Sequence, residues 1–194
     1  MDAADLDSII KFLQKAEGLK DALRSAYTGT GRKESAAEHS WRLSLLALLL
    51  GGRFKGANLE KMLKLCIVHD LAEAVCGDIP APEQEGLAEC EKSTLEREAM
   101  RELCAVLPEA ERAEIFTLWE EYESCATPEA RLIKAMDKLE TLIQHNQGVN
   151  NGEIRYDFNL GYGQKYMDCH PLIRQLRDMV DRDTALNAEK QKRG

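Results

Sequence analysis

The stretch CIVHDLAEAVCGDIP (residues 66–80) places an adjacent histidine and aspartate, His69 and Asp70, near the end of an apolar run. Glu73 and Asp78 follow shortly after this pair. Polar side chains among apolar ones cost free energy unless they are hydrogen-bonded, paired or bound to a metal ion. Two interpretations are therefore open: these residues are satisfied core and capping groups, or they form the centre of a reaction.

The apolar residues around this stretch repeat with a helical period, as they do along nearly the whole chain. No convincing strand alternation is present, so we predict an all-α fold in a single-domain helical bundle. A capping box at Ser35 and Glu38, and Thr127 before a proline, mark two helix starts. Asn58 is a further predicted N-cap. The predicted helices span residues 4–17, 35–50, 58–76, 86–106, 109–124, 128–147 and 171–183, with a helical turn at 18–25 and loops at 26–35, 77–82 and 148–163.

Length and composition agree with one globular domain. The 194 residues, 44% of them hydrophobic, are enough to bury a core without disulfides. Six cysteines without a C-x-x-C pair are interpreted as free thiols in a reducing compartment. The net charge of −8, without a basic stripe, argues against a nucleic-acid polymer as partner. The N-terminus lacks the basic region of a signal peptide and no apolar run could span a membrane, so we expect a cytoplasmic protein with no membrane partner.

Three predicted helices each carry a polar residue on the apolar face. Leucines follow His39 at +4, +7 and +11, and apolar residues precede both His69 and Asp137 at −4 and −7. With Asp70, these residues make a mixed nitrogen and oxygen set that suits a divalent first-row ion. A lone histidine on an apolar face is more often a satisfied core residue. Spacing alone therefore leaves the metal site and the core interpretation open.

Three motifs carry a family resemblance: EHS at residues 38–40, VHDLAEAVCGDI at 68–79 and AMDKLE at 135–140. The chain resembles the HD-domain superfamily of metal-dependent phosphohydrolases. Within it, the chain is most similar to the YfbR-like 5′-deoxynucleotidases and to relatives of the HD-domain-containing protein 2 type. The resemblance implies a single HD domain over residues 1–194, with a core at about 19–147, a last helix at about 171–183 and a polar tail at 184–194.

The resemblance implies that His39, His69, Asp70 and Asp137 bind one divalent metal ion. The family favours manganese or cobalt, and magnesium, zinc, nickel or iron are possible. Four protein ligands leave places on a six-coordinate ion for water and a phosphate oxygen. The chain has only four histidines in all, which favours one metal over two.

The two acidic residues after the HD pair match the family's catalytic positions. Glu73 and Asp78 are the implied groups that orient or deprotonate the attacking water, or protonate the leaving ribose oxygen. Asp78 is also an implied substrate-binding residue. Without the resemblance, the better interpretation is a surface glutamate and an aspartate that stabilises a turn.

Arg24 matches the family arginine in the segment L-K-x-x-x-R, and a guanidinium fork suits phosphate. Ser25 stands where the deoxynucleotidases carry a tryptophan that helps to reject a ribose 2′-hydroxyl. Tyr27 stands where relatives with an R-T-G-W pattern carry theirs. We interpret Arg24, Ser25 and Tyr27 as substrate-binding residues, with the preference for deoxyribose open. His145, eight residues after Asp137 and on roughly the same helix face, could support the site from behind the ligands, but a packing or surface residue is favoured.

The sequence therefore predicts a 5′-nucleotidase, a phosphoric monoester hydrolase acting on nucleoside 5′-monophosphates and in particular on deoxyribonucleotides. One alternative is an HD phosphohydrolase for ribonucleotides or another small phosphate ester. A second is a non-enzymatic nucleotide- or metal-binding protein, which the presence of both Glu73 and Asp78 disfavours. The resemblance also implies a homodimer.

Overall fold

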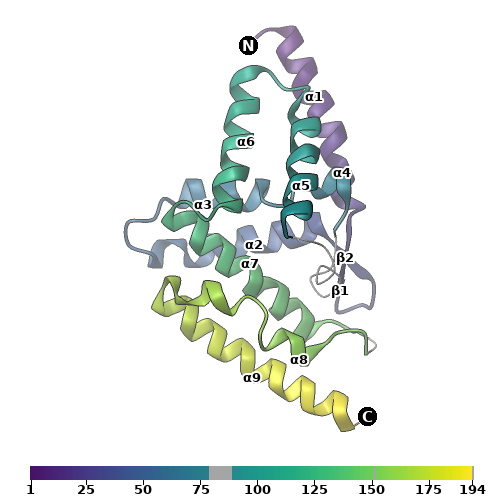
Figure 1. Cartoon of the computed structure of the whole chain (residues 1–194), viewed down its shortest axis with the longest axis vertical. Coiled ribbons are helices and arrows are strands. Elements are labelled where there is room, and N and C mark those ends of the chain that lie inside the picture. Colours follow the sequence, from purple (N-terminus) through teal and green to yellow (C-terminus); the bar gives the residue numbers. More distant parts are fainter. Residues whose placement is uncertain (79–88, 151, 194) are drawn as a thin grey trace.

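Helices dominate the computed structural model, which describes residues 1–78, 89–150 and 152–193 (Figure 1). The longer helices are α1 (Ala3–Ala16), α2 (Ala36–Leu50), α3 (Leu59–Val68), α5 (Glu89–Cys104), α6 (Glu109–Glu123), α7 (Pro128–Gln147) and α9 (Pro171–Arg193). Shorter helical segments are η1 (Glu17–Lys20), η2 (Gly51–Arg53), α4 (Glu73–Cys76), α8 (Tyr156–Asn159) and η4 (Gln164–Cys169). The predicted all-α class is confirmed. None of the described helices is long and apolar enough to cross a membrane.

The predicted caps fix the starts of the two helices that matter most for the site. At α2, the Ser35 hydroxyl accepts the Glu38 backbone N–H, and the Glu38 carboxylate accepts the Ser35 N–H in return. At α7, the Thr127 hydroxyl accepts the N–H of Ala130. Each cap satisfies donors that have no partner within the helix. Helices α2 and α7 carry two of the predicted metal ligands, so these caps set where those side chains stand.

The segment between α1 and α2 differs from the prediction. Instead of a helical turn and a loop, the chain forms η1 and then an antiparallel hairpin of β1 (Leu23–Tyr27) and β2 (Lys33–Ser35). The register shifts along β1, so β1 carries extra residues as a bulge. Strands this short show no usable alternation in the sequence. A two-stranded hairpin is marginal by itself and depends on tertiary contacts, here with α2 and α7.

The predicted helix at 58–76 is two helices. Asn58 caps the start of α3 as predicted, accepting the N–H of Lys61, but α3 ends at Val68. A run of turns separates it from α4, which ends at Gly77 with a positive φ of 75° that glycine adopts without strain. Most of the predicted loop at 77–82 and the predicted helix start at 86–88 lie outside the described residues.

The last helix is longer than predicted. Helix α9 continues to Arg193, so residues 184–193 are helical rather than a polar tail. Thr184 and Ala188 lie one turn apart and are both buried, and the side chain of Asn187 donates to the backbone carbonyl of Asn146. The sequence of residues 184–193 gives little sign of this helix, because it is mostly polar and only about one residue per turn is buried.

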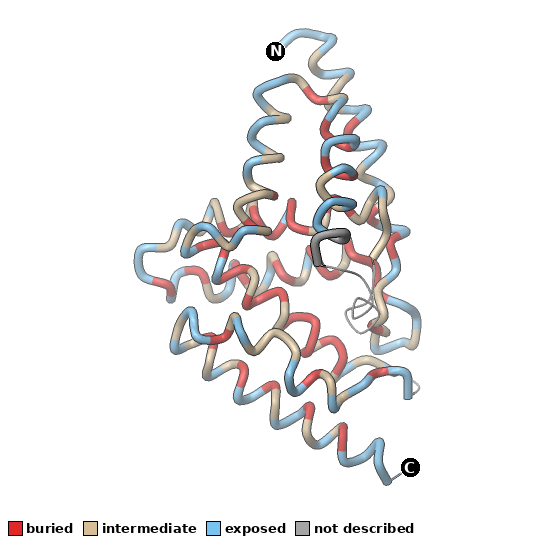
Figure 2. The backbone as a smooth tube through the Cα atoms, viewed as in Figure 1, coloured by how far each residue is buried: buried red, intermediate tan, exposed pale blue. Residues whose placement is uncertain are grey.

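The buried apolar residues form two clusters, and Figure 2 shows buried residues along most of the helices. The first lies between α2, α3, α7 and α9, and the second between α1, α5, α6 and the segment that follows α3. Most residues of α7 are buried, which makes it the central helix. Five of the cysteines are free thiols; burial raises the pKa of Cys66 to about 12 and that of Cys104 to about 11, and the side chain of Cys90 lies outside the described residues.

Candidate active site

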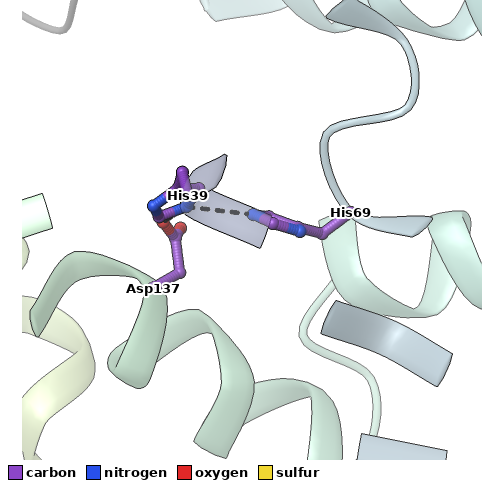
Figure 3. A group of neighbouring side chains, drawn as sticks. All are labelled: His39, His69 and Asp137. Carbon is purple, nitrogen blue, oxygen red and sulfur yellow. Dashed lines mark hydrogen bonds and ion pairs between the residues drawn. The ribbon is translucent and has the colours of Figure 1, made fainter. Parts of the chain in front are cut away.

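The predicted metal ligands meet where α2, the end of α3 and α7 come together (Figure 3). The Nε2 atom of His39 lies 3.3 Å from Nε2 of His69 and 3.1 Å from Oδ1 of Asp137. Oδ2 of Asp70 lies 3.1 Å from Nε2 of His69 and 3.7 Å from Nε2 of His39. His39, His69 and Asp137 are buried. Residues far apart in the chain thus bring nitrogen and carboxylate oxygen atoms to one point.

Hydrogen bonds on the far side of each imidazole decide which nitrogen faces this point. Nδ1 of His69 lies 2.9 Å from the carbonyl oxygen of Cys66, which can only accept, so Nδ1 carries the hydrogen. Nδ1 of His39 donates in the same way to the carboxylate of Glu140. In the neutral rings both Nε2 atoms therefore present lone pairs to one another and to two carboxylates. This donor set fits a divalent first-row metal ion.

The closeness of these charged groups also shifts the pKa of His39, the histidine on α2. Burial and the nearby Arg24 guanidinium both oppose protonation of His39. The carboxylates of Glu140 and Asp137 outweigh them and raise the pKa of His39 to about 9. Burial would raise the pKa of Asp70, yet the histidines and Arg24 hold it below its usual range. The site favours a positive charge between its carboxylates, whether a proton or a metal ion supplies it.

Asp137 is held in place by two side chains that the sequence motifs do not single out. The hydroxyl of Tyr122 donates to Oδ2 of Asp137 at 2.6 Å, and Nζ of Lys138 lies 2.9 Å from the same oxygen. These contacts leave Oδ1 facing His39. Glu140 was also missed, although its position in AMDKLE, three residues after Asp137, places it one turn along the same helix face.

The ligand cluster lies at the wall of a cavity of about 330 Å³. The structure brings most of the predicted site residues to this wall: Arg24, Ser25, His69, Asp70, Glu73, Asp78 and Asp137. Of the predicted site residues, His39 lies behind the wall, where it is fully buried. The cavity also has an aromatic and polar side contributed by residues 153–162.

Arg24 reaches the cavity from β1, within the stretch where the register of the hairpin shifts. Its NH1 atom lies 3.5 Å from Oδ2 of Asp70, and its NH2 atom donates to the Thr141 hydroxyl at 3.1 Å. Its Nε lies 3.7 Å from a carboxylate oxygen of Glu34. Although burial favours loss of the proton, Asp70 and the other carboxylates raise the pKa of Arg24 above its usual range. Arg24 is therefore a half-buried, charged fork that faces carboxylates.

Glu73 and Asp78 lie in the same wall, at the start of α4 and just after its end. Both are half-buried, and both carboxylates help to raise the pKa of Arg24. The two acids therefore line the same cavity as the guanidinium and act on its charge. Their position fits the acid and base roles that the family resemblance implies.

Tyr27, also predicted to bind substrate, lies beside the cavity wall and contacts one of its residues. Among the described residues that line the cavity, Ser25 is present and Tyr27 is not. The Tyr27 hydroxyl instead donates at 2.6 Å to Glu153, whose side chain does line the cavity. The contact of Tyr27 with a sugar stays a prediction. Glu153 lies between α7 and α8, where no sequence pattern singled it out.

A family model described as HD domain matches residues 16–177. The chain belongs to the HD-domain family. The family assignment made from the three motifs is thus confirmed.

Individual relatives agree with the family match. The 5′-deoxynucleotidase HDDC2 of Danio rerio is 37% identical over 144 residues, which cover 73% of this chain and 70% of the relative. The 5′-deoxynucleotidase hdd1 of Schizosaccharomyces pombe is 37% identical over 150 residues, 74% of each chain. A crystal structure titled as a predicted metal-dependent phosphohydrolase from Magnetospirillum magnetotacticum has a TM-score of 0.78 at 24% identity, covering 97% of this chain and 95% of that one. That likeness shows the shared fold.

Proposed function

We propose that this protein is a metal-dependent phosphohydrolase that removes the phosphate group from nucleoside 5′-monophosphates, deoxyribonucleotides in particular. The observation that carries the proposal is the convergence of two imidazole lone pairs and two carboxylates beside a cavity that also holds Arg24. The substrate class is supported by the relatives named as 5′-deoxynucleotidases. The net charge of −8 does not conflict with an anionic substrate, because local cations set the field inside a pocket.

His39, His69, Asp70 and Asp137 are the proposed ligands of one divalent ion. Manganese or cobalt is proposed first, with magnesium, zinc, nickel or iron as alternatives, because imidazole and carboxylate ligands accept all of these. When bound, such an ion supplies a Lewis acid for the phosphate and lowers the pKa of a nearby water.

The side chains of the cavity wall supply the remaining chemistry. Arg24 binds two phosphate oxygens with its fork and neutralises the charge that spreads over the equatorial oxygens in the transition state. Its fixed position in a buried wall makes this charge more effective than it would be in water. Glu73 and Asp78 take the proton of the attacking water and return one to the leaving 5′-oxygen. The products are a nucleoside and inorganic phosphate.

A second candidate function is hydrolysis of ribonucleotides or another small phosphate ester. Ser25 favours it, because this small side chain lines the cavity at the position where the deoxynucleotidases carry a tryptophan. A non-enzymatic nucleotide- or metal-binding protein would keep the ligands but release no phosphate.

We further propose that the protein is a cytoplasmic homodimer and that it binds no nucleic-acid polymer. Light scattering coupled to gel filtration measures the oligomeric state.

The test is a substrate panel with the purified protein in Mn²⁺ or Co²⁺. We expect phosphate release from dAMP and other deoxyribonucleotides, with AMP and simple phosphate esters in the same panel deciding between the candidates. EDTA and Asp70→Ala should each abolish release. The control is Asp178→Asn, which changes an exposed aspartate of α9. A folded, metal-supplied protein that releases no phosphate from any ester would refute the enzymatic function.

A further inference from the structure

His145, near the end of α7, is a buried side chain of the cavity wall for which the proposed function has no role. Its exposed fraction is 9%, and it is one of the residues that line the cavity. The sequence alone favours a packing or surface residue at this position. Its ring instead has a hydrogen-bond partner at Nδ1 and, among the described residues, none at Nε2.

The held nitrogen is Nδ1. The side-chain amide of Asn159 donates to it at 3.0 Å, so Nδ1 accepts and the hydrogen of the neutral ring is on Nε2. Burial lowers the pKa of His145 to about 4, and the ring is neutral near neutral pH. Among the described residues, Nε2 is buried and has no hydrogen-bond partner. A buried donor without an acceptor costs free energy, and a bound ligand with a suitable oxygen would remove that cost.

The surroundings of the ring hold it in this orientation. The backbone carbonyl of His145 accepts hydrogen bonds from the side chains of Asn150 and Tyr156. Asn159 is itself buried, and its backbone carbonyl accepts from Arg177, a fully buried side chain of α9. Helices α8 and α9 thus fix Asn159, and Asn159 fixes the tautomer of His145. The donor is preorganised for a ligand.

The position of His145 along α7 indicates which part of a nucleotide it would meet. Thr141 holds the NH2 atom of Arg24, the proposed phosphate-binding group. His145 follows four residues later, which is about 6 Å along the helix axis and on nearly the same face. This is the scale on which a sugar separates a 5′-phosphate from its 3′-oxygen.

We propose that His145 is a substrate-binding residue that donates its Nε2 hydrogen to the 3′-oxygen of the nucleotide sugar. Asn159 is the positioning residue that keeps this hydrogen on Nε2. The inference rests on the proposed function for the place of the phosphate. It adds a recognition element for the sugar about two turns along α7 from Asp137.

The experiment compares two substrates, dAMP and 2′,3′-dideoxyadenosine 5′-monophosphate, which lacks the 3′-oxygen. His145→Phe keeps a flat ring without a donor, and His145→Gln keeps an amide donor. The wild-type protein should prefer dAMP by about tenfold in kcat/KM, the value expected for one buried hydrogen bond. His145→Phe should lose about tenfold with dAMP and almost nothing with the dideoxy nucleotide. His145→Gln should keep part of the preference.

Equal losses with both nucleotides in His145→Phe, or no loss with either, would overturn the inference, because a structural role does not distinguish the 3′-oxygen. If His145→Phe does not fold, His145→Leu and Asn159→Leu provide the same comparison. Calorimetric binding of both nucleotides is measured in parallel. A protein that binds them but hydrolyses no ester refutes the proposed function, while the ratio of the two affinities still decides the inference. If neither nucleotide binds, both are refuted.

Discussion

The two ends of the cavity wall are built on opposite principles. At the end where α2, α3 and α7 meet, charged groups face opposite charges, with His39 between Glu140 and Asp137. At the end formed with α8, one polar group of the wall is a neutral ring, His145, which keeps one donor unsatisfied among the described residues. The first end pairs its charges within the protein, although Nε of Arg24 and Oε2 of Glu34 make no hydrogen bond there within the described part of the chain. The second is complete only when a ligand supplies an acceptor.

Because of this difference, we expect substitutions at the two ends to affect activity in different ways. A phosphate ester of any kind needs the charged end, so a substitution there should affect all substrates alike. The neutral end meets only the nucleoside part, so a substitution there should affect substrates according to their sugar. Ratios between substrates therefore separate the two ends more sharply than the activity with one substrate does.

The largest effect is expected for Asp137→Asn. The substitution keeps the shape of the side chain but removes a negative charge that faces His39, Tyr122 and Lys138. We expect kcat/KM to fall by roughly a thousandfold with every phosphate ester, together with loss of bound metal. Steady-state kinetics and metal analysis measure the two effects. Activity that survives with a full complement of metal would show that Asp137 is not a ligand.

Arg24→Lys should have the next largest effect. Lysine keeps the charge but not the fork that bridges Asp70, Thr141 and the phosphate, so we expect a loss of roughly a hundredfold in kcat/KM for all substrates. The matched control is Arg32→Lys, on the same hairpin, where the arginine is mostly exposed and pairs with Glu38. A similar loss of kcat/KM in both variants would mean that activity depends on the hairpin as a whole rather than on the Arg24 guanidinium.

The charged end was predictable from the sequence and the neutral end was not, for physical reasons. His39, His69 and Asp137 are polar residues on apolar helix faces, and the helical period of their neighbours is enough to project them inward. Glu153 and Asn159 lie outside the long helices, where no period exists and only tertiary contacts decide direction. Arg24 lies between these cases, because its strand belongs to a hairpin too short to recognise from the sequence.

Glu140→Gln tests how strongly metal binding depends on the carboxylate that accepts the hydrogen bond of His39. The Glu140 carboxylate accepts the Nδ1 hydrogen of His39 and also pairs with Arg42. Glutamine keeps an acceptor but not the charge, so we expect metal affinity to fall by about tenfold, at the low end for groups behind metal ligands. Competitive metal titration measures the affinity. An unchanged affinity would show that the orientation of His39 does not need the charge of Glu140.

The smallest effect concerns the start of the helix that carries His39. The Glu38 carboxylate closes the capping box and pairs with Arg32, and chiefly that arginine lowers the pKa of Glu38 to about 2. Because the folded pKa lies below the usual value of 4.5, the stabilisation is fully present above about pH 4.5 and is lost as the pH falls towards 2.

Glu38→Gln should therefore lower the free energy of unfolding by about 0.5 kcal/mol at pH 7, since the pair is largely exposed and glutamine still caps. The difference from the wild-type protein should shrink between pH 4.5 and pH 2. Urea unfolding at several pH values measures it, with Glu60→Gln, an exposed first-turn glutamate of α3, as the matched control. A constant difference across this range would assign the effect to packing at the helix start, since only the ionised carboxylate carries the pH dependence.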